Sequence, residues 1–221
     1  MFGQSTDEGP RRPVHPALWA VAGFMVAVEV VFAAVEAGLL PDTFARYRVY
    51  LVFAFWDPLF DHAVETGTPP LQLAWSFLTH ALLHGGWLHL GLNTAAFLAL
   101  GHAVSQMAGI RACLVTTAVS AIAGGLAFGL IAEVDVPLVG ASGAIFGLLA
   151  TLTAWQEQAL RRAGLPRTDV WNRIMGLILI NLLLDLGLGG MLAWEAHLGG
   201  FVGGWLMAYV YPPRLMRPAS P

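Results

Sequence analysis

The apolar stretch ALWAVAGFMVAVEVVFAAVEAGLL, residues 17–40, places this chain among membrane proteins. It is longer than the roughly 20 residues that a helix needs to cross the hydrocarbon core of a bilayer. It is also longer than the apolar core of a cleavable export signal, which is about 7–15 residues. We therefore predict that it forms a first membrane span.

Composition extends this prediction to the whole chain. Of the 221 residues 57% are hydrophobic and only 11% are charged, and the mean hydropathy is +0.67. Soluble domains carry roughly 25% charged residues, and this length suits one domain. We predict an all-α, polytopic membrane helix bundle over residues 17–212, between a flexible N-terminal tail (1–16) and a short C-terminal tail (213–221). The further spans are predicted at residues 87–104, 111–132, 140–155, 175–190 and 194–211.

Two further expectations concern the ends of the spans and the loop between the first two. Several predicted spans are shorter than about 20 residues, so some helix ends should lie below the membrane surface. Between the first two spans, residues 41–73 contain both aromatic and acidic side chains. We predict that they form a structured, partly amphipathic loop at the membrane interface.

The arginines indicate how the spans are oriented. All basic residues are arginines, and loops on the cytoplasmic side of membranes are enriched in them. With six spans only Arg46 and Arg48 fall on one side; the other arginines fall on the opposite side, so both termini should be cytoplasmic. Spans two, four and six then begin in the outer leaflet. Polar side chains lie near these three starts, at His89, Asn93, Ser142 and His197.

Ser142 is the candidate nucleophile. Polar groups within spans are costly and usually face the protein interior or a water-filled cavity. Ser142 lies in GASGAIFG, residues 140–147, which differs from the Gly-x-Ser-x-Gly elbow of soluble hydrolases because Ala144 replaces the second glycine. The alternative is a packing face of small residues, with Gly143 and Gly147 four residues apart.

His197 and the second span supply the groups that a serine nucleophile needs. A neutral histidine within hydrogen-bonding reach can take the proton of a serine hydroxyl, although His197 alone could equally bridge two helices structurally. His89 and Asn93 are four residues apart and share a helix face. Two donors aimed at one point can stabilise an oxyanion.

Other classes of protein fit the sequence less well. The metalloprotease pattern His-Glu-x-x-His is absent, because no glutamate lies between the histidines of residues 80–93, so we predict no metal. A net charge of −3 argues against nucleic acid as a partner. A channel or transporter remains an alternative, because histidines and asparagines also line proton pathways. The chain lacks the internal repeat of common transporters.

Three motifs together resemble the rhomboid family of intramembrane serine proteases. They are His-x4-His-x3-Asn (His84, His89 and Asn93), Gly-x-Ser-Gly at residues 140–143, and Ala-His-x-x-Gly-x-x-x-Gly at residues 196–204. The resemblance implies a six-helix fold in which Ser142 is the nucleophile and His197 the general base. His89, Asn93 and the backbone N–H of Ser142 would form the oxyanion hole. The supporting residues would be His80, His84, Gly143, Phe146, Gly200 and Gly204.

The resemblance also implies partners and a location. We expect a multi-pass protein of a bacterial inner membrane that needs no cofactor. Its substrates would be single-span or multi-span membrane proteins, cut near the outer face. An inactive rhomboid-like protein that binds transmembrane helices is the alternative, although inactive relatives lack the serine or the histidine and this chain keeps both.

Two departures from the family pattern bear on the site. Rhomboids often carry Trp-Arg before the second span, whereas this chain has Trp75-Ser76. Some members have a tyrosine one turn after the serine, where this chain has Phe146, whose ring can still stack on the histidine. We expect no carboxylate to complete a triad, although Asp185 and Glu195 lie close enough in sequence to be suspects.

Two intramembrane polar residues have no role in this scheme. Asn181 is expected to hydrogen-bond to another helix. Glu29 is expected to be neutral or hydrogen-bonded inside the bundle.

Overall fold

The computed structural model describes residues 13–187 and 192–214, apart from the side chains of Leu184 and Asp185. Within this part the regular structure is helical, and one β-bridge joins Phe55 to Leu138. The predicted all-α class is therefore confirmed. The elements are α1 (Pro16–Glu36), η1 (Asp42–Phe44), α2 (Arg46–Phe53), α3 (Asp57–Thr66), α4 (Leu71–Thr79), η2 (His80–Leu82), α5 (Trp87–Ala108), α6 (Ile110–Ile131), α7 (Ser142–Arg162), α8 (Thr168–Gly187) and α9 (Trp194–Val210).

Parts of the predictions lie outside the described residues. These are the tails at residues 1–12 and 215–221, the end of the fifth predicted span beyond residue 187, and the side chain of Asp185.

The six long helices correspond to the six predicted spans, but their ends differ. Helices α5, α7 and α8 have 22, 21 and 20 residues, so each is longer than the apolar span predicted for it. That some helix ends lie below the membrane surface stays a prediction. Hydropathy locates only the apolar part of a helix. Helix α7 continues through the sequence QEQALRR, residues 156–162, because these residues favour helix. By length and composition alone, α1 and α6 qualify as membrane spans.

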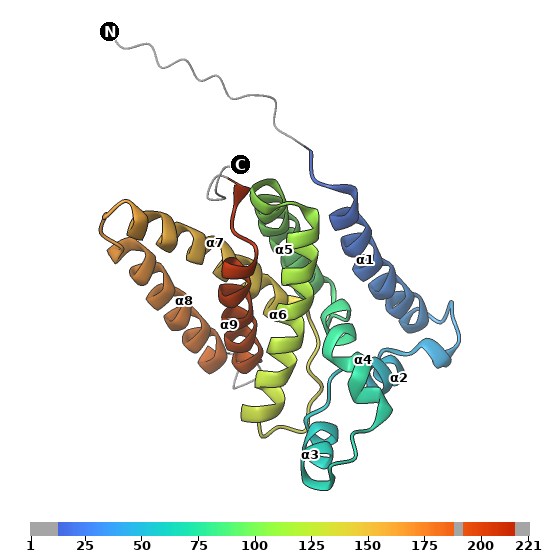
Figure 1. Ribbon diagram of the computed structural model, residues 1–221. Helices are drawn as coiled ribbons and strands as arrows, with labels where there is room; N and C mark the ends of the chain where they lie inside the picture. The colour runs from blue at the N-terminus through green and yellow to red at the C-terminus, as the bar shows by residue number, and fades with distance from the viewer. Residues whose placement is uncertain (1–12, 188–191, 215–221) are drawn as a thin grey trace.

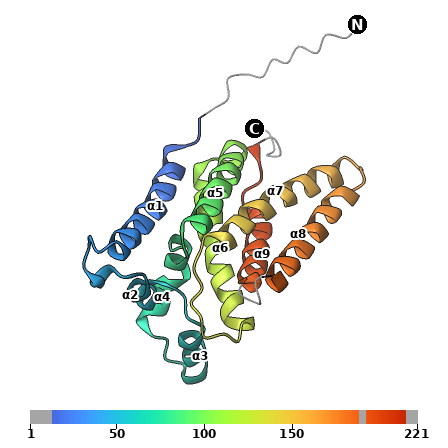
Figure 2. The same ribbon diagram turned by 180° about the vertical axis from the view of Figure 1, so that it is seen from behind.

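The helices form a bundle whose centre is α6, α7 and α9 (Figure 1). Helix α1 packs on α5 at one edge, and α8 lies at the other edge, as the reverse view also shows (Figure 2). Helices α2, α3 and α4 gather at the end of the bundle opposite the C-terminal end of α9 (Figure 1). The structured loop between the first two spans is therefore confirmed.

The outer surface of the bundle is apolar. On α8, for example, Ile178, Leu179 and Ile180 are each 55% exposed. Large continuous apolar patches are rare on soluble monomers and usually mark contact with a membrane or a partner.

Glycines bring the backbones of α7 and α9 into direct contact. A Cβ atom at Gly200 would collide with the carbonyl oxygen of Gly143, and one at Gly204 with that of Gly147. The hydroxyl of Thr151 donates to the Gly204 carbonyl at 2.8 Å across the same interface. This packing leaves little freedom for one helix to slide on the other, and it fixes the distance between their first turns.

Candidate active site

Ser142 and His197 meet at the starts of α7 and α9. Ser142 is the first residue of α7, and it follows a turn in which Gly140 has φ 118°, a value that favours glycine. His197 lies in the first turn of α9 and its side chain is buried. The Oγ atom of Ser142 lies 2.8 Å from Nε2 of His197, within hydrogen-bonding distance.

Asn181 of α8 holds the other nitrogen of the same imidazole. Its amide nitrogen donates to the Leu177 carbonyl at 2.9 Å, so its Oδ1 faces Nδ1 of His197, at 2.6 Å. Because Oδ1 can only accept, Nδ1 of His197 must carry the hydrogen. The lone pair of Nε2 is then free to accept the hydroxyl hydrogen of Ser142.

The expected hydrogen bond from Asn181 to another helix is therefore present, and its partner is His197. The sequence signal was an amide in an otherwise apolar span. That signal predicts a polar contact but does not identify the partner.

Phe146 constrains the imidazole from one face. Its ring lies parallel to that of His197, with an angle of 8° and a centroid distance of 4.4 Å. Phe146 is one helical turn after Ser142, so the residue that stacks on the histidine and the residue that bonds to it come from the same helix.

His89 of α5 lies beside the turn that precedes Ser142. A Cβ atom at Gly140 would be only 2.8 Å from both Cε1 and Nε2 of His89, so the imidazole rests against that glycine. The backbone N–H of Gly85 donates to Nδ1 of His89 at 3.3 Å. Since Nδ1 accepts, Nε2 carries the hydrogen and is a donor on the Gly140 side.

Asn93 lies one turn after His89 and is buried. One amide hydrogen bonds to the carbonyl oxygen of His89 at 2.9 Å. The amide nitrogen has a second hydrogen for another acceptor.

His80 and His84 are buried beneath the same turn. The carbonyl oxygen of His80 accepts the N–H of Gly140 at 2.9 Å, and the ring of His84 meets that of His89 edge-on at 5.1 Å between centroids. Burial lowers the pKa of each imidazole to about 4, so both are neutral at physiological pH. They pack the turn as neutral groups and add no charge to the site.

An apolar cavity of about 550 Å³ opens beside His197, between α7, α8 and α9. Among the described residues that line it, Asn181 and His197 are polar and the others are apolar, including Phe146, Ile178 and Phe201. A hydrophobic segment of another protein could therefore lie against the imidazole.

The site combines a serine hydroxyl, a neutral imidazole anchored at its far nitrogen, and a second imidazole that presents a donor nearby. This combination suits nucleophilic attack on a carbonyl group, with the first imidazole as base and the second as an oxyanion donor.

Comparison with known proteins places these residues in a family. The Rhomboid domain family matches residues 72–214. An uncharacterized protein of Mycobacterium tuberculosis is 34% identical over 159 residues, covering 65% of this chain and 62% of that protein. The rhomboid protease GluP of Bacillus subtilis is 33% identical over 138 residues, which are 61% of this chain and 25% of GluP. RHOMBOID-like protein 5 of Arabidopsis thaliana is 31% identical over 151 residues, covering 65% of this chain and 45% of that protein.

The chain thus spans less than two thirds of the length of these relatives. The family match nevertheless takes in most of the chain and contains every residue that meets at the site. This helical protein therefore belongs to the rhomboid family of integral membrane proteins, a family that includes serine proteases.

Proposed function

We propose that this chain is an intramembrane serine endopeptidase that cuts membrane-anchored proteins near the outer end of a transmembrane segment. The observation that supports this most strongly is the 2.8 Å contact between Ser142 Oγ and His197 Nε2. It joins the first turns of two helices that tight glycine packing holds together, so the pair is preorganised.

In the proposed reaction, Oγ of Ser142 attacks the carbonyl carbon of the scissile peptide bond while its proton passes to Nε2 of His197. The carbonyl oxygen becomes an oxyanion, which accepts hydrogen bonds from Nε2 of His89, the amide of Asn93 and the N–H of Ser142. The intermediate collapses, the C–N bond breaks, and the leaving amine takes the proton from His197. Water, deprotonated by the same imidazole, then hydrolyses the acyl-enzyme and regenerates Ser142.

The substrate must unwind before it can be cut. Within a transmembrane helix each amide is hydrogen-bonded internally and shielded, because lipid offers no alternative partner. We therefore propose that substrates carry small or helix-breaking residues near the cut. The cavity beside His197 offers such a segment an apolar surface next to the base.

Covalent labelling tests this proposal directly. A fluorophosphonate probe reacts with an activated serine, so the wild-type protein in detergent or nanodiscs should be labelled at Ser142. Labelling should disappear in Ser142→Ala and His197→Ala. A folded wild-type protein that resists labelling and cuts no single-span reporter would instead indicate the inactive, helix-binding alternative.

We further propose that Asn181 fixes the tautomer of His197 and stabilises the imidazolium that forms during attack. Asn181→Leu should lower kcat about 10- to 100-fold, the range expected when a charged group loses one hydrogen bond. The matched control is Asn172→Leu at the start of the same helix, which should retain wild-type activity. Equal activity of the two variants in a reporter cleavage assay would remove Asn181 from the mechanism.

The orientation of the chain is also a proposal, based on the distribution of the arginines. Both termini should be cytoplasmic. A reporter fused after Pro221 should then report the cytoplasm, and one inserted between Asp61 and Thr68 should report the outside. Fusions that report the same compartment would contradict the six-span orientation and the outer location of the site.

A further inference from the structure

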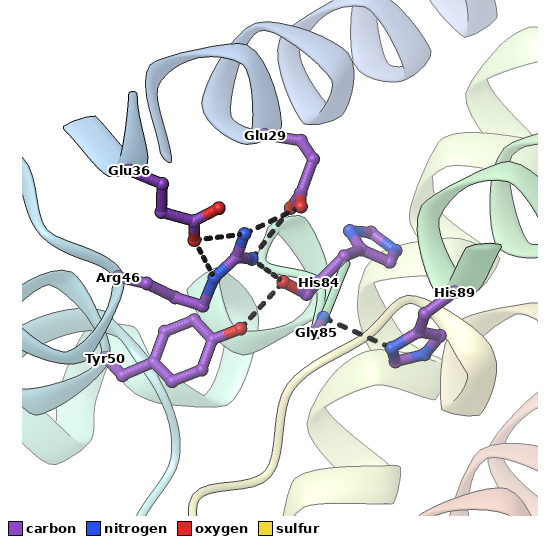
Figure 3. A network of polar contacts seen from close by, with 7 residues as sticks. All are labelled: Glu29, Glu36, Arg46, Tyr50, His84, Gly85 and His89. Carbon is purple, nitrogen blue, oxygen red and sulfur yellow. Dashed lines mark hydrogen bonds and ion pairs between the residues drawn. The ribbon is translucent and has the colours of Figure 1, made fainter. Parts of the chain in front are cut away.

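An ion cluster joins α1 to the loop helix α2 (Figure 3). The guanidinium of Arg46 forms two hydrogen bonds with the carboxylate of Glu29, at 2.8 and 3.0 Å, and one ion pair with Glu36 at 3.1 Å. The Glu29 side chain is 1% exposed and that of Glu36 is 61% exposed, so the inner pair is buried and the outer pair lies at the surface. The expected hydrogen bonding of Glu29 is thus present.

Arg46 of this cluster and the nearby Tyr50 both donate hydrogen bonds to one backbone carbonyl group. Arg46 Nη1 donates to the carbonyl oxygen of His84 at 2.7 Å, and the hydroxyl of Tyr50 donates to it at 2.7 Å as well (Figure 3). The hydrogen bond with Glu29 raises the pKa of Arg46, and burial raises that of Tyr50. Both groups therefore keep their hydrogens at physiological pH and remain donors.

The carbonyl of His84 belongs to the same peptide unit as the N–H of Gly85. In a trans peptide these two groups lie in one plane and point in opposite directions. The N–H of Gly85 is the donor to Nδ1 of His89, at 3.3 Å (Figure 3). Arg46 and Tyr50 thus bind the carbonyl oxygen of this rigid peptide unit, and the imidazole of His89 accepts a hydrogen bond from its N–H.

This arrangement decides which nitrogen of His89 carries the hydrogen. While the peptide N–H occupies Nδ1, the neutral imidazole has its hydrogen on Nε2 and can donate to an oxyanion. If the peptide plane turned, Nδ1 could take the hydrogen, and the lone pair of Nε2 would then repel an oxyanion.

We propose that Glu29, Arg46 and Tyr50 are positioning residues that keep His89 in the donor tautomer by fixing the His84–Gly85 peptide plane. The inference deepens the proposed function, because it gives the oxyanion donor its orienting group. Glu29 matters because an unpaired arginine would be free to leave the carbonyl. Its buried carboxylate, two turns before the end of α1, accepts two of the hydrogens of Arg46 and directs a third at His84.

Tyr50→Phe and Arg46→Gln test the proposal. Tyr50→Phe removes only the hydroxyl, because the ring keeps its edge-on contact with Phe32, at 6.0 Å between centroids. Arg48→Gln is the matched control, since Arg48 is an exposed arginine of the same helix whose guanidinium lies over Tyr47. All three purified variants are compared with wild type by thermal unfolding first.

Two readouts then separate positioning from general stability. ¹⁵N NMR of histidine-labelled protein reports the tautomer of His89 whether or not the protein is an enzyme. The rate of fluorophosphonate labelling reports oxyanion stabilisation. We expect labelling to slow about 3- to 10-fold in Tyr50→Phe and about 10- to 100-fold in Arg46→Gln, with loss of the pure Nε2–H tautomer, and no change in Arg48→Gln.

The outcomes distinguish this proposal from the proposed function. If wild type is not labelled, the proposed function fails. The tautomer measurement still tests whether Glu29, Arg46 and Tyr50 position His89. An unchanged His89 tautomer in folded Arg46→Gln overturns the proposed positioning role of Glu29, Arg46 and Tyr50. An altered tautomer with an unchanged labelling rate overturns it as well. If Arg46→Gln does not fold, Tyr50→Phe decides the question by the same two readouts.

Discussion

Ser142→Ala and His197→Ala should each abolish cleavage of a single-span reporter protein. Without the hydroxyl there is no nucleophile, and without the imidazole the hydroxyl keeps its proton, because no other described base contacts it. In a serine protease, loss of either member of such a pair costs roughly a million-fold in kcat. The double variant should be no worse than either single variant, since the two residues act as one unit.

Suitable controls exist within the chain. Ser105→Ala removes a buried hydroxyl of α5 that bonds to the carbonyl of His102 in its own helix, at 2.8 Å. His62→Ala removes an exposed histidine of α3. Both should cleave at the wild-type rate. Cleavage by purified Ser142→Ala, or a double variant far worse than both single variants, would show that the two residues do not form a catalytic pair.

The positions of the spans could be predicted because membrane insertion depends on apolar length, which is local in sequence. The ends of the helices could not, because backbone hydrogen bonding continues through polar residues with good helix propensity, as at the C-terminal end of α7. The convergence of Ser142 and His197 could be predicted because successive spans run in alternate directions, which puts the starts of the fourth and sixth spans at the same end of the bundle. The distance between them depends on how closely α7 and α9 approach, and this comes from the tertiary packing of their glycines.

The contacts that sequence did not identify cross between elements. Asn181 contacts His197 only if α8 turns the face that carries Asn181 towards α9. Hydropathy does not specify which face of an apolar helix points in that direction. Glu29 and Arg46 are separated by the end of α1 and the turn of η1, so their pairing depends on how the loop folds back. The sequence identified each of these residues as a polar group in an unexpected position, but its bonding partner is known only from the fold.

The departure at Trp75-Ser76 has a structural counterpart. Ser76 is buried and its hydroxyl donates to the Leu73 carbonyl within α4, while Trp75 donates to the Val52 carbonyl at 2.9 Å. The arginine that binds the backbone of the loop between α1 and α5 in this chain is Arg46, which comes from α2. The loop thus has an arginine anchor, although not at the position where many rhomboids carry one.

The second large effect is expected at the oxyanion hole. His89→Ala and Asn93→Ala should each lower kcat about 100- to 1,000-fold, the usual cost of losing one oxyanion donor. The KM for the reporter should change little, because the proposed role of these donors is to bind the oxyanion and not the ground-state segment. His102→Ala, at the other end of α5, is the matched control for a histidine on the same helix and should cleave normally.

The double variant refines the assignment. The amide of Asn93 bonds to the backbone carbonyl of His89, so removing it also loosens the turn of α5 that carries the histidine. The effects of the two substitutions should therefore be less than multiplicative, since Asn93→Ala already weakens part of what His89 contributes. Independent donors would give a fully multiplicative loss. A raised KM with an unchanged kcat in either single variant would instead place that residue in substrate docking. The other of the two residues and the N–H of Ser142 would then be the remaining proposed donors to the oxyanion.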